Sequence, residues 1–409
     1  MLVPSSLRCL PAWANRVSRI PLTRGNSYLS RNNTFFNRKR ELTEFTEALS
    51  SPRPRIHVLL GPPNSGKTTL VQQVVDKLPF KPLFFDCRGG IFSTPTNMYY
   101  AIINQFYPYF KQLSVSSPSL KVDTRNIFKR KSEINAQDVI GLLRRISDPL
   151  LKWAQIEKEP APILIIDEAN MLKLLGDSSE LALTSLLTWL VKNSIQDQRF
   201  HVVLTTSDPL FLNWIQNILN ISHLTPYVVG DLSKEDAEEY FDTYLLPQFD
   251  SEISSELKGK FDEVSKVTGT RMYVIEKFVE EYKYHKGEIE KFSMFEQEFN
   301  RLKFGLEYEK PKKIHKFEEK PLWDGDDLRD TLKEIVEKNN EFIYTNDLVL
   351  QIGEVKVNSL LEHNFLHLRP TQRFTYDIDN LDVSKVGSIL TPTNRPLAYA
   401  MEYILNGRF

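Results

Sequence analysis

A phosphate-binding pattern lies between residues 61 and 68. Its spacing is G-x-x-x-x-G-K-T, with Gly61, Gly66, Lys67 and Thr68 at the fixed positions. Glycines let the backbone curl so that successive N–H groups point at one anion. A lysine that reaches the β- and γ-phosphates and a hydroxyl that binds Mg²⁺ complete such a loop. The pattern predicts a set of phosphate-binding residues, which are Gly61, Pro62, Pro63, Asn64, Ser65, Gly66, Lys67, Thr68 and Thr69.

The residues on either side supply the elements that such a loop requires. The apolar run Ile56–Leu60 predicts a buried parallel strand before the loop, and Thr69–Leu78 predicts a helix after it. The helix N-terminus adds a partial positive charge that favours a phosphate. The alternative is a chance match in a flexible loop, which would require neither flanking element.

A second motif, Pro162–Glu168, is an apolar run that ends in two acids. A buried parallel strand would carry Asp167 and Glu168 to the carboxyl edge of the sheet, where the loop also opens. There Asp167 would bind Mg²⁺ together with Thr68, and Glu168 would act as general base on a water molecule. The alternative is a strand that simply ends in solvated acids.

Three further groups are candidates for contact with a nucleotide. Thr206 ends the predicted strand Phe200–Asp208 and could orient water or sense the γ-phosphate, with Thr205 and Ser207 as alternatives. An ordinary threonine-rich strand end would look the same. Arg271 follows a turn at Gly269 and could reach the γ-phosphate from a helical lid, or lie on the surface.

The segment before the first strand offers a last candidate pair. Asn37 and Arg38 precede a predicted amphipathic helix, Glu41–Leu49, and could lie over the nucleotide base or near the phosphates. A purely structural helix with a basic start remains the alternative.

The N-terminal leader differs in composition from the rest of the chain. Residues 1–40 contain no Asp or Glu and include Arg8, Arg16, Arg19, Arg24 and Arg31. This composition predicts a mitochondrial transit peptide over residues 1–31, with a basic tail on a cytoplasmic protein as the alternative. Its removal would change the formal charge from −1 to −6, because five arginines and no acid would be lost. The rest of the chain would then have no strong bias towards nucleic acid or membrane.

These pieces together resemble the archaeal-type ATPases of the AAA+/STAND group over about residues 34–285. The resemblance rests on Phe-x-Asn-Arg before the first strand, GPPNSGKT, LIIDE, the hydroxyl-tipped strand, D-L-S-x-E-D-A from Asp231 and the V-T-G turn. It implies an ATP-binding core, a helical lid and a winged-helix module. Residues 213–230 lack the Arg or Lys that such ATPases often place near the fifth strand. Hydrolysis would then be slow, depend on a partner, or use Arg199 or Arg271.

The C-terminal part follows a charged, proline-flanked stretch that predicts a linker over residues 305–324. Residues 325–409 have the order of a winged helix, with Phe365–Arg369 and Arg373–Asp377 as the expected wing strands. This module holds nine Lys+Arg and thirteen Asp+Glu, a net charge of −4. Because phosphate contacts require a basic surface, protein contact is favoured over nucleic acid, although Arg369 and Arg373 leave the latter open.

The sequence therefore predicts an α/β P-loop NTPase with a five-stranded parallel sheet over residues 34–230, a helical lid over 231–304 and a winged-helix-like domain over 325–409. We expect it to bind ATP with Mg²⁺ and to hydrolyse it to drive a switch that controls a protein partner. The alternatives are a nucleic-acid-associated ATPase and a nucleotide-loaded scaffold with negligible turnover. No run of about 18 apolar residues predicts a transmembrane helix. Oligomerisation stays open.

Overall fold

The computed structural model describes the chain from Arg38 onward, with short gaps. The described residues are 38–77, 80–116, 122–128, 131, 133–156, 161–219, 224–308, 321–337, 342–371, 373–374, 376–378, 381 and 387–407. The predicted transit peptide, Asn37 and most of the predicted linker lie outside these residues.

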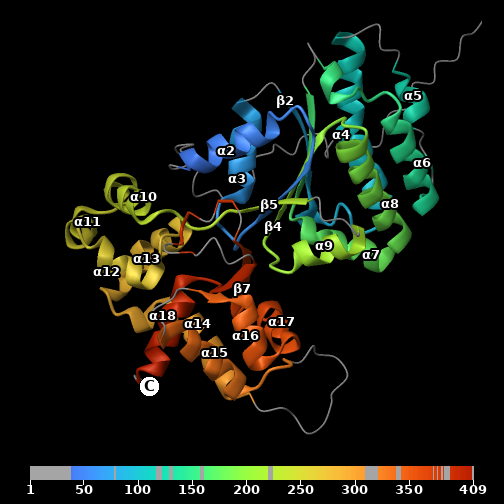
Figure 1. Ribbon diagram of the computed structural model, residues 1–409. Helices are drawn as coiled ribbons and strands as arrows, with labels where there is room; N and C mark the ends of the chain where they lie inside the picture. The colour runs from blue at the N-terminus through green and yellow to red at the C-terminus, as the bar shows by residue number, and fades with distance from the viewer. Residues whose placement is uncertain are drawn as a thin grey trace, which may run out of the picture. The chain divides into compact units, whose positions relative to one another are not determined.

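A five-stranded parallel sheet forms the centre of the first part of the chain (Figure 1). The strand order is β2-β3-β4-β1-β5, so β4 lies between the strands that precede the two motifs. Every residue of β1, β3 and β4 is buried, as their apolar runs predict. The strands are β1 (Ile56–Leu60), β2 (Phe80–Asp86), β3 (Ala161–Asp167), β4 (His201–Thr206) and β5 (Leu224–Val228). The predicted α/β fold with a parallel five-stranded sheet is confirmed.

Helices cover both faces of this sheet. In Figure 1, α2 and α3 lie on one side, and α4, α5, α6 and α8 lie on the other. A buried aromatic cluster from α4, including Tyr99, Phe106 and Phe110, packs with α6 and α8 against the strands. The α-helices are α2 (Lys39–Leu49), α3 (Lys67–Lys77), α4 (Pro95–Ser116), α5 (Thr124–Ile127), α6 (Ala136–Ser147), α7 (Leu172–Ser178), α8 (Glu180–Val191) and α9 (Phe211–Leu219). A rigid framework therefore fixes the carboxyl edge of the sheet, where both motifs lie.

Five α-helices follow β5 and form the region predicted as a lid. They are α10 (Lys234–Glu239), α11 (Ser251–Leu257), α12 (Phe261–Thr268), α13 (Met272–His285) and α14 (Ser293–Leu306). The predicted turn between α12 and α13 is at Gly269, which has φ +65°. A Cβ atom there would lie 2.8 Å from Cβ of Arg395, so this turn fits closely against the C-terminal part of the chain.

The C-terminal part is winged-helix-like in the order of its elements. It contains α15 (Gly325–Glu337), β6 (Ile343–Tyr344), α16 (Thr345–Ile352), α17 (Glu354–Glu362), β7 (Leu366–Pro370), β8 (Ser388–Pro392) and α18 (Arg395–Leu405). Its three strands are antiparallel in the order β6-β8-β7. Helix α18 packs on α12, α14 and α15, so the last helix joins this part to the lid.

The predicted second wing strand, Arg373–Asp377, is wrong. Strand β7 pairs instead with β8, and the described residues of the intervening segment leave the wing and reach the parallel sheet. The Val228 amide donates to the Arg373 carbonyl at 3.2 Å, and the Phe374 ring lies 4.8 Å from that of Tyr227. The prediction fails because Phe374 is buried against the core rather than against the wing. We call the described residues among 369–378 the crossing segment.

Among the described residues, no helix is long and apolar enough to span a membrane.

Two buried histidines predict a loss of stability in mild acid. His57 of β1 and His201 of β4 stack, with Nε2 of His57 and Nδ1 of His201 3.0 Å apart. Burial lowers the pKa of His201 to about 4, with the Ser51 carbonyl opposing, and lowers the pKa of His57. The folded pKa of His201 lies below the unfolded value near 6.5, so protonation of this side chain costs no stability above that pH. As the pH drops from 6.5 towards 4, the unfolded chain binds the proton before the folded chain does, and the free energy of unfolding falls.

We expect the free energy of unfolding to fall by about 2 kcal/mol for His201 alone between pH 7.5 and pH 5. Urea unfolding at the two pH values measures this change. His201→Gln should flatten the dependence, and an equally steep dependence in that variant would refute the assignment.

Candidate functional site

The phosphate-binding loop leaves β1 at Gly61 and enters α3 at Lys67. A Cβ atom at Gly61 would lie 2.3 Å from the Val229 carbonyl oxygen, so a side chain there would displace the backbone just after β5. Gly66 and Asn64 have φ values of +89° and +63°, in the region that glycine and asparagine tolerate best. The glycines at the fixed positions are therefore required by the curl of the loop.

Lys67 is buried within this loop and holds its ammonium at the loop's centre. Its Nζ donates to the carbonyls of Gly61 at 3.0 Å and Pro62 at 2.9 Å, and to Oγ of Ser207 at 3.0 Å. Burial lowers its pKa to about 8, against the opposing effect of Glu168 and Asp167. A bound phosphate would favour the charged form, so this lysine suits an anion.

Asp167 and Thr68 are in direct contact although 99 residues separate them. Oγ1 of Thr68 donates to Oδ1 of Asp167 at 2.8 Å. The Thr205 hydroxyl donates to the same oxygen, and Nη2 of Arg88 donates to Oδ2 at 3.0 Å. A hydroxyl and a carboxylate at the end of a phosphate loop are the oxygen donors that Mg²⁺ prefers, so the residues fit this metal.

Glu168 follows Asp167 and has an unusual backbone for a residue that is not glycine. Its φ and ψ are both 52°, in the left-handed region, where the chain turns from β3 into a short 3₁₀ turn. Such conformations cost about 1–3 kcal/mol and gather at functional sites. The side chain is only partly exposed, and burial raises the pKa of its carboxyl, with Lys67 opposing. A carboxylate with a raised pKa is better suited to accept a proton.

The three hydroxyls at the end of β4 have different partners. Thr206 donates to Oδ1 of Asn170 at 3.1 Å and is fully buried. Thr205 contacts Asp167, and Ser207 accepts from Lys67. Of these three, Ser207 is the one that contacts Lys67, and the role predicted for Thr206 at the γ-phosphate stays a prediction.

The predicted arginines are bound to protein groups. Arg38 donates to Glu41 at 3.0 Å and to the carbonyls of Ser65 at 2.9 Å and Gly230 at 2.8 Å. It thus braces the loop against the chain after β5, and its predicted contact with a nucleotide stays a prediction. Arg199, the proposed substitute arginine, donates to the Leu150 carbonyl at 3.2 Å, and also contacts the Ser147 carbonyl, away from both motifs.

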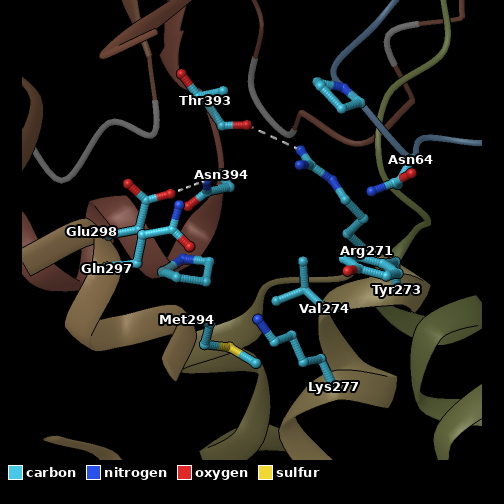
Figure 2. Close-up of a pocket in the computed structure, with 12 residues that line it drawn as sticks. Asn64, Arg271, Tyr273, Val274, Lys277, Met294, Gln297, Glu298, Thr393 and Asn394 are labelled. Atoms are coloured by element: carbon cyan, nitrogen blue, oxygen red, sulfur yellow. Dashed lines mark hydrogen bonds between the residues drawn. The ribbon is translucent and has the colours of Figure 1, made fainter. Parts of the chain in front are cut away.

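Arg271 begins α13 and connects three parts of the chain. Its Nε donates to Oδ1 of Asp231 after β5 at 2.8 Å, and its Nη2 donates to the Thr393 carbonyl after β8 at 3.2 Å. Figure 2 shows Arg271 beside Asn64 of the phosphate loop, in a pocket of about 180 Å³. The pocket is lined by Pro63, Asn64, Arg271, Tyr273, Val274, Lys277, Met294, Gln297, Glu298, Thr393, Asn394 and Pro396.

Two site residues were missed by the sequence analysis. Asp86 is the last residue of β2, and Arg88 lies just after this strand. Both lie beside Asp167. The signal was the polar ending of the strand Phe80–Asp86, which places its last side chains at the same sheet edge as both motifs.

The fold and the site define a P-loop nucleotide-binding protein. Residues 35–278 match the family described as an ATPase domain predominantly from Archaea. Because this match covers more than half of the chain, the protein belongs to that family.

Relatives and solved structures are similar to the chain over much of its length. It is 25% identical over 394 residues to an uncharacterised ATP-binding protein of Methanocaldococcus jannaschii, which covers 91% of this chain and 98% of that protein. A second such protein from the same organism is 26% identical over 303 residues, 62% of this chain and 80% of its own. The Walker-type ATPase of Pyrococcus abyssi has 15% identity and a TM-score of 0.47, covering 90% of this chain and 96% of that one.

Proposed function

We propose that this protein binds ATP with Mg²⁺ and hydrolyses it. The contact between Thr68 and Asp167, beside the buried Lys67, supports this proposal more than any other observation. Mg²⁺, when bound, would neutralise charge on the phosphates. In this proposal the loop amides and Lys67 bind the phosphates, Thr68 and Asp167 hold the metal, and Glu168 takes a proton from the attacking water.

Hydrolysis would depend on a suitably placed arginine. Among the described residues from 213 to 230 there is no Arg or Lys. Arg199 lies elsewhere, Arg271 is paired with Asp231, and Arg88 is paired with Asp86 and Asp167. An arginine acting on the transferred phosphate can contribute about 10³–10⁵ in rate. We therefore propose slow intrinsic turnover that a partner stimulates, with a nucleotide-loaded scaffold as the limiting case.

Arg271 would couple the nucleotide to the rest of the chain. It lines the pocket beside Pro63 and Asn64 of the phosphate loop together with Lys277, so two cations lie at the edge of this loop. A γ-phosphate would compete with Asp231 and the Thr393 carbonyl for Arg271. Its release from these partners would loosen the link between the core, the lid and the winged-helix-like part.

The crossing segment supports the same proposal. Arg369 and Asp377 form a two-bond ion pair at 3.0 and 2.6 Å, and Asp377 also accepts from the Asp231 amide at 3.0 Å. Burial lowers the pKa of His367 on β7 to about 3, and Arg369, Arg271 and Lys67 act in the same direction. Strand β7 is therefore within electrostatic reach of the phosphate-binding lysine.

A protein partner is favoured over nucleic acid. Arg369 and Arg373 left the nucleic-acid alternative open, but Arg369 is paired with Asp377 and Arg373 donates to the Tyr227 hydroxyl at 2.7 Å. A module with net charge −4 then offers few cations for phosphate contacts. Activity stimulated by DNA or RNA would reverse this preference.

The acid-free leader supports mitochondrial targeting as a further part of the proposal. Import of a reporter that carries residues 1–31 into isolated mitochondria tests it. A reporter that stays outside would leave the cytoplasmic alternative.

The experiment that tests the function measures Mg·ATP binding and turnover of the chain beside Lys67→Ala. We expect the variant to weaken Mg·ATP binding by at least about tenfold, because a buried cation that contacts phosphate contributes about 1.5–3 kcal/mol. A folded wild-type protein that binds no nucleotide would refute the proposal. Mg·ATP binding without turnover would favour the alternative of a nucleotide-loaded scaffold.

A further inference from the structure

Two acidic side chains meet at the ends of β2 and β3, and Arg88 joins them. The strand register pairs Asp86 with Asp167. Nε and Nη2 of Arg88 donate to the two oxygens of Asp86 at 2.8 and 3.0 Å, and Nη2 also donates to Oδ2 of Asp167 at 3.0 Å. Arg88 is thus a cation at the predicted metal site. It contacts Oδ2 of Asp167, whereas Thr68 contacts Oδ1.

The burial of the partners indicates what this cation does. The Asp167 side chain is 1% exposed, whereas that of Arg88 is 54% exposed. A buried carboxylate without a compensating charge is costly, so Arg88 balances the charge of Asp167. Because the guanidinium is half-exposed, it can move without opening the core.

The charges around the site can be counted. Asp86, Asp167 and Glu168 are acidic, and Lys67 and Arg88 are basic. Arg38 and Arg271 also act on Lys67, but they are paired with Glu41 and Asp231 and are left out of the count. With all five ionised, three negative and two positive charges leave one excess negative charge. Without Arg88 the excess would be two negative charges beside the Thr68 hydroxyl, which would oppose the entry of a divalent cation less than the present set does.

Building on the proposed function, we propose that Arg88 makes the site select for the metal–nucleotide complex over the free metal. Its charge opposes the entry of a bare divalent cation beside Asp167. The same charge favours the anionic complex of metal and ATP, whose phosphates can accept hydrogen bonds from a guanidinium. Arg88 also orients Asp167, because it donates to Oδ2 while Oδ1 accepts from Thr68 and Thr205.

This proposal predicts opposite changes in two affinities. In Arg88→Ala, the loss of repulsion should tighten the binding of Mn²⁺ alone by about tenfold, and the loss of a phosphate partner should weaken Mg·ATP binding by about tenfold. Arg88→Lys, which keeps the charge but not the forked geometry, should retain most of the exclusion of free Mn²⁺. A merely structural role would weaken both affinities together.

The experiment uses the full chain and measures free Mn²⁺ by electron paramagnetic resonance during titration without nucleotide. Mg·ATP binding is then measured by calorimetry. The matched control is Arg53→Ala, which removes an exposed arginine from the loop before β1, and it should change neither affinity.

Tighter Mn²⁺ binding with weaker Mg·ATP binding in Arg88→Ala supports the proposal. Unchanged or weaker Mn²⁺ binding overturns it. A wild-type chain that binds no Mg·ATP would refute the proposed function instead, and the nucleotide-free titration separates the two failures.

Discussion

Replacing Glu168 by Gln is expected to lower ATP turnover by about 10²- to 10⁴-fold, the usual contribution of a general base. Gln has nearly the same size and keeps the backbone shape, but its amide cannot accept the proton of the attacking water. The partly exposed Glu168 does not contact Thr68 or Lys67 through any hydrogen bond found among the described residues. Binding of Mg·ATP should therefore change only a few-fold.

The measurement compares single-turnover hydrolysis with equilibrium binding on one preparation. Glu180→Gln, at an exposed position in α8, is the matched control and should turn over like the wild type. Equal turnover in Glu168→Gln would exclude Glu168 as the base. Loss of both binding and turnover would indicate a structural role for its left-handed backbone.

Both nucleotide motifs could be predicted from sequence because their chemistry is local. Each combines a buried strand with polar residues at its carboxyl end, and parallel strands bring such ends to one edge. The pairing of Thr68 with Asp167 follows from that rule alone. The match to the archaeal ATPase family confirms the resemblance that these motifs carried.

Arg88 and Ser207 could not be ranked from sequence because their roles depend on which strands are neighbours. Arg88 gains its role only when the register of β2 and β3 places Asp86 beside Asp167. Ser207 rather than Thr206 faces Lys67 because the side chains alternate at the end of β4. Spacing along the chain contains neither fact.

The crossing segment shows a second limit. The sequence predicts a wing strand over Arg373–Asp377, but Phe374 is buried with Phe45 and Tyr227, both far away in the sequence. A buried site for one aromatic side chain outweighed the local preference for a hairpin.

The second large effect is expected for the substitution Gly230→Ala, because Gly230 lies against Asp377 of the crossing segment. A Cβ atom at Gly230 would lie 2.2 Å from Oδ1 and 2.3 Å from Cγ of Asp377. The new methyl group should displace the Asp377 carboxylate and break its contacts with Arg369 and the Asp231 amide. Arg369 is 6% exposed, and leaving such a buried charge unpaired costs about 3–5 kcal/mol. The crossing segment should then leave the core.

Hydrogen exchange in residues 369–378 measures this release. Gly230→Ala should lose protection in these residues, while Gly141→Ala, which places a methyl group beside the flexible end of Arg145, should not. In an Asp377→Ala background the Gly230 substitution should add little, because the carboxylate that it displaces is already absent. Full additivity of the two effects would refute the proposed clash.

The same measurement tests the switch. If ATP draws Arg271 away from Asp231 and Thr393, Mg·ATP should lower the protection of the crossing segment in the wild type towards the level of Gly230→Ala. In Gly230→Ala itself, Mg·ATP should change that protection little, because the segment is already released. Mg·ATP that binds without any change in the wild type would separate nucleotide binding from this segment, and the switch would then have to act through the lid alone.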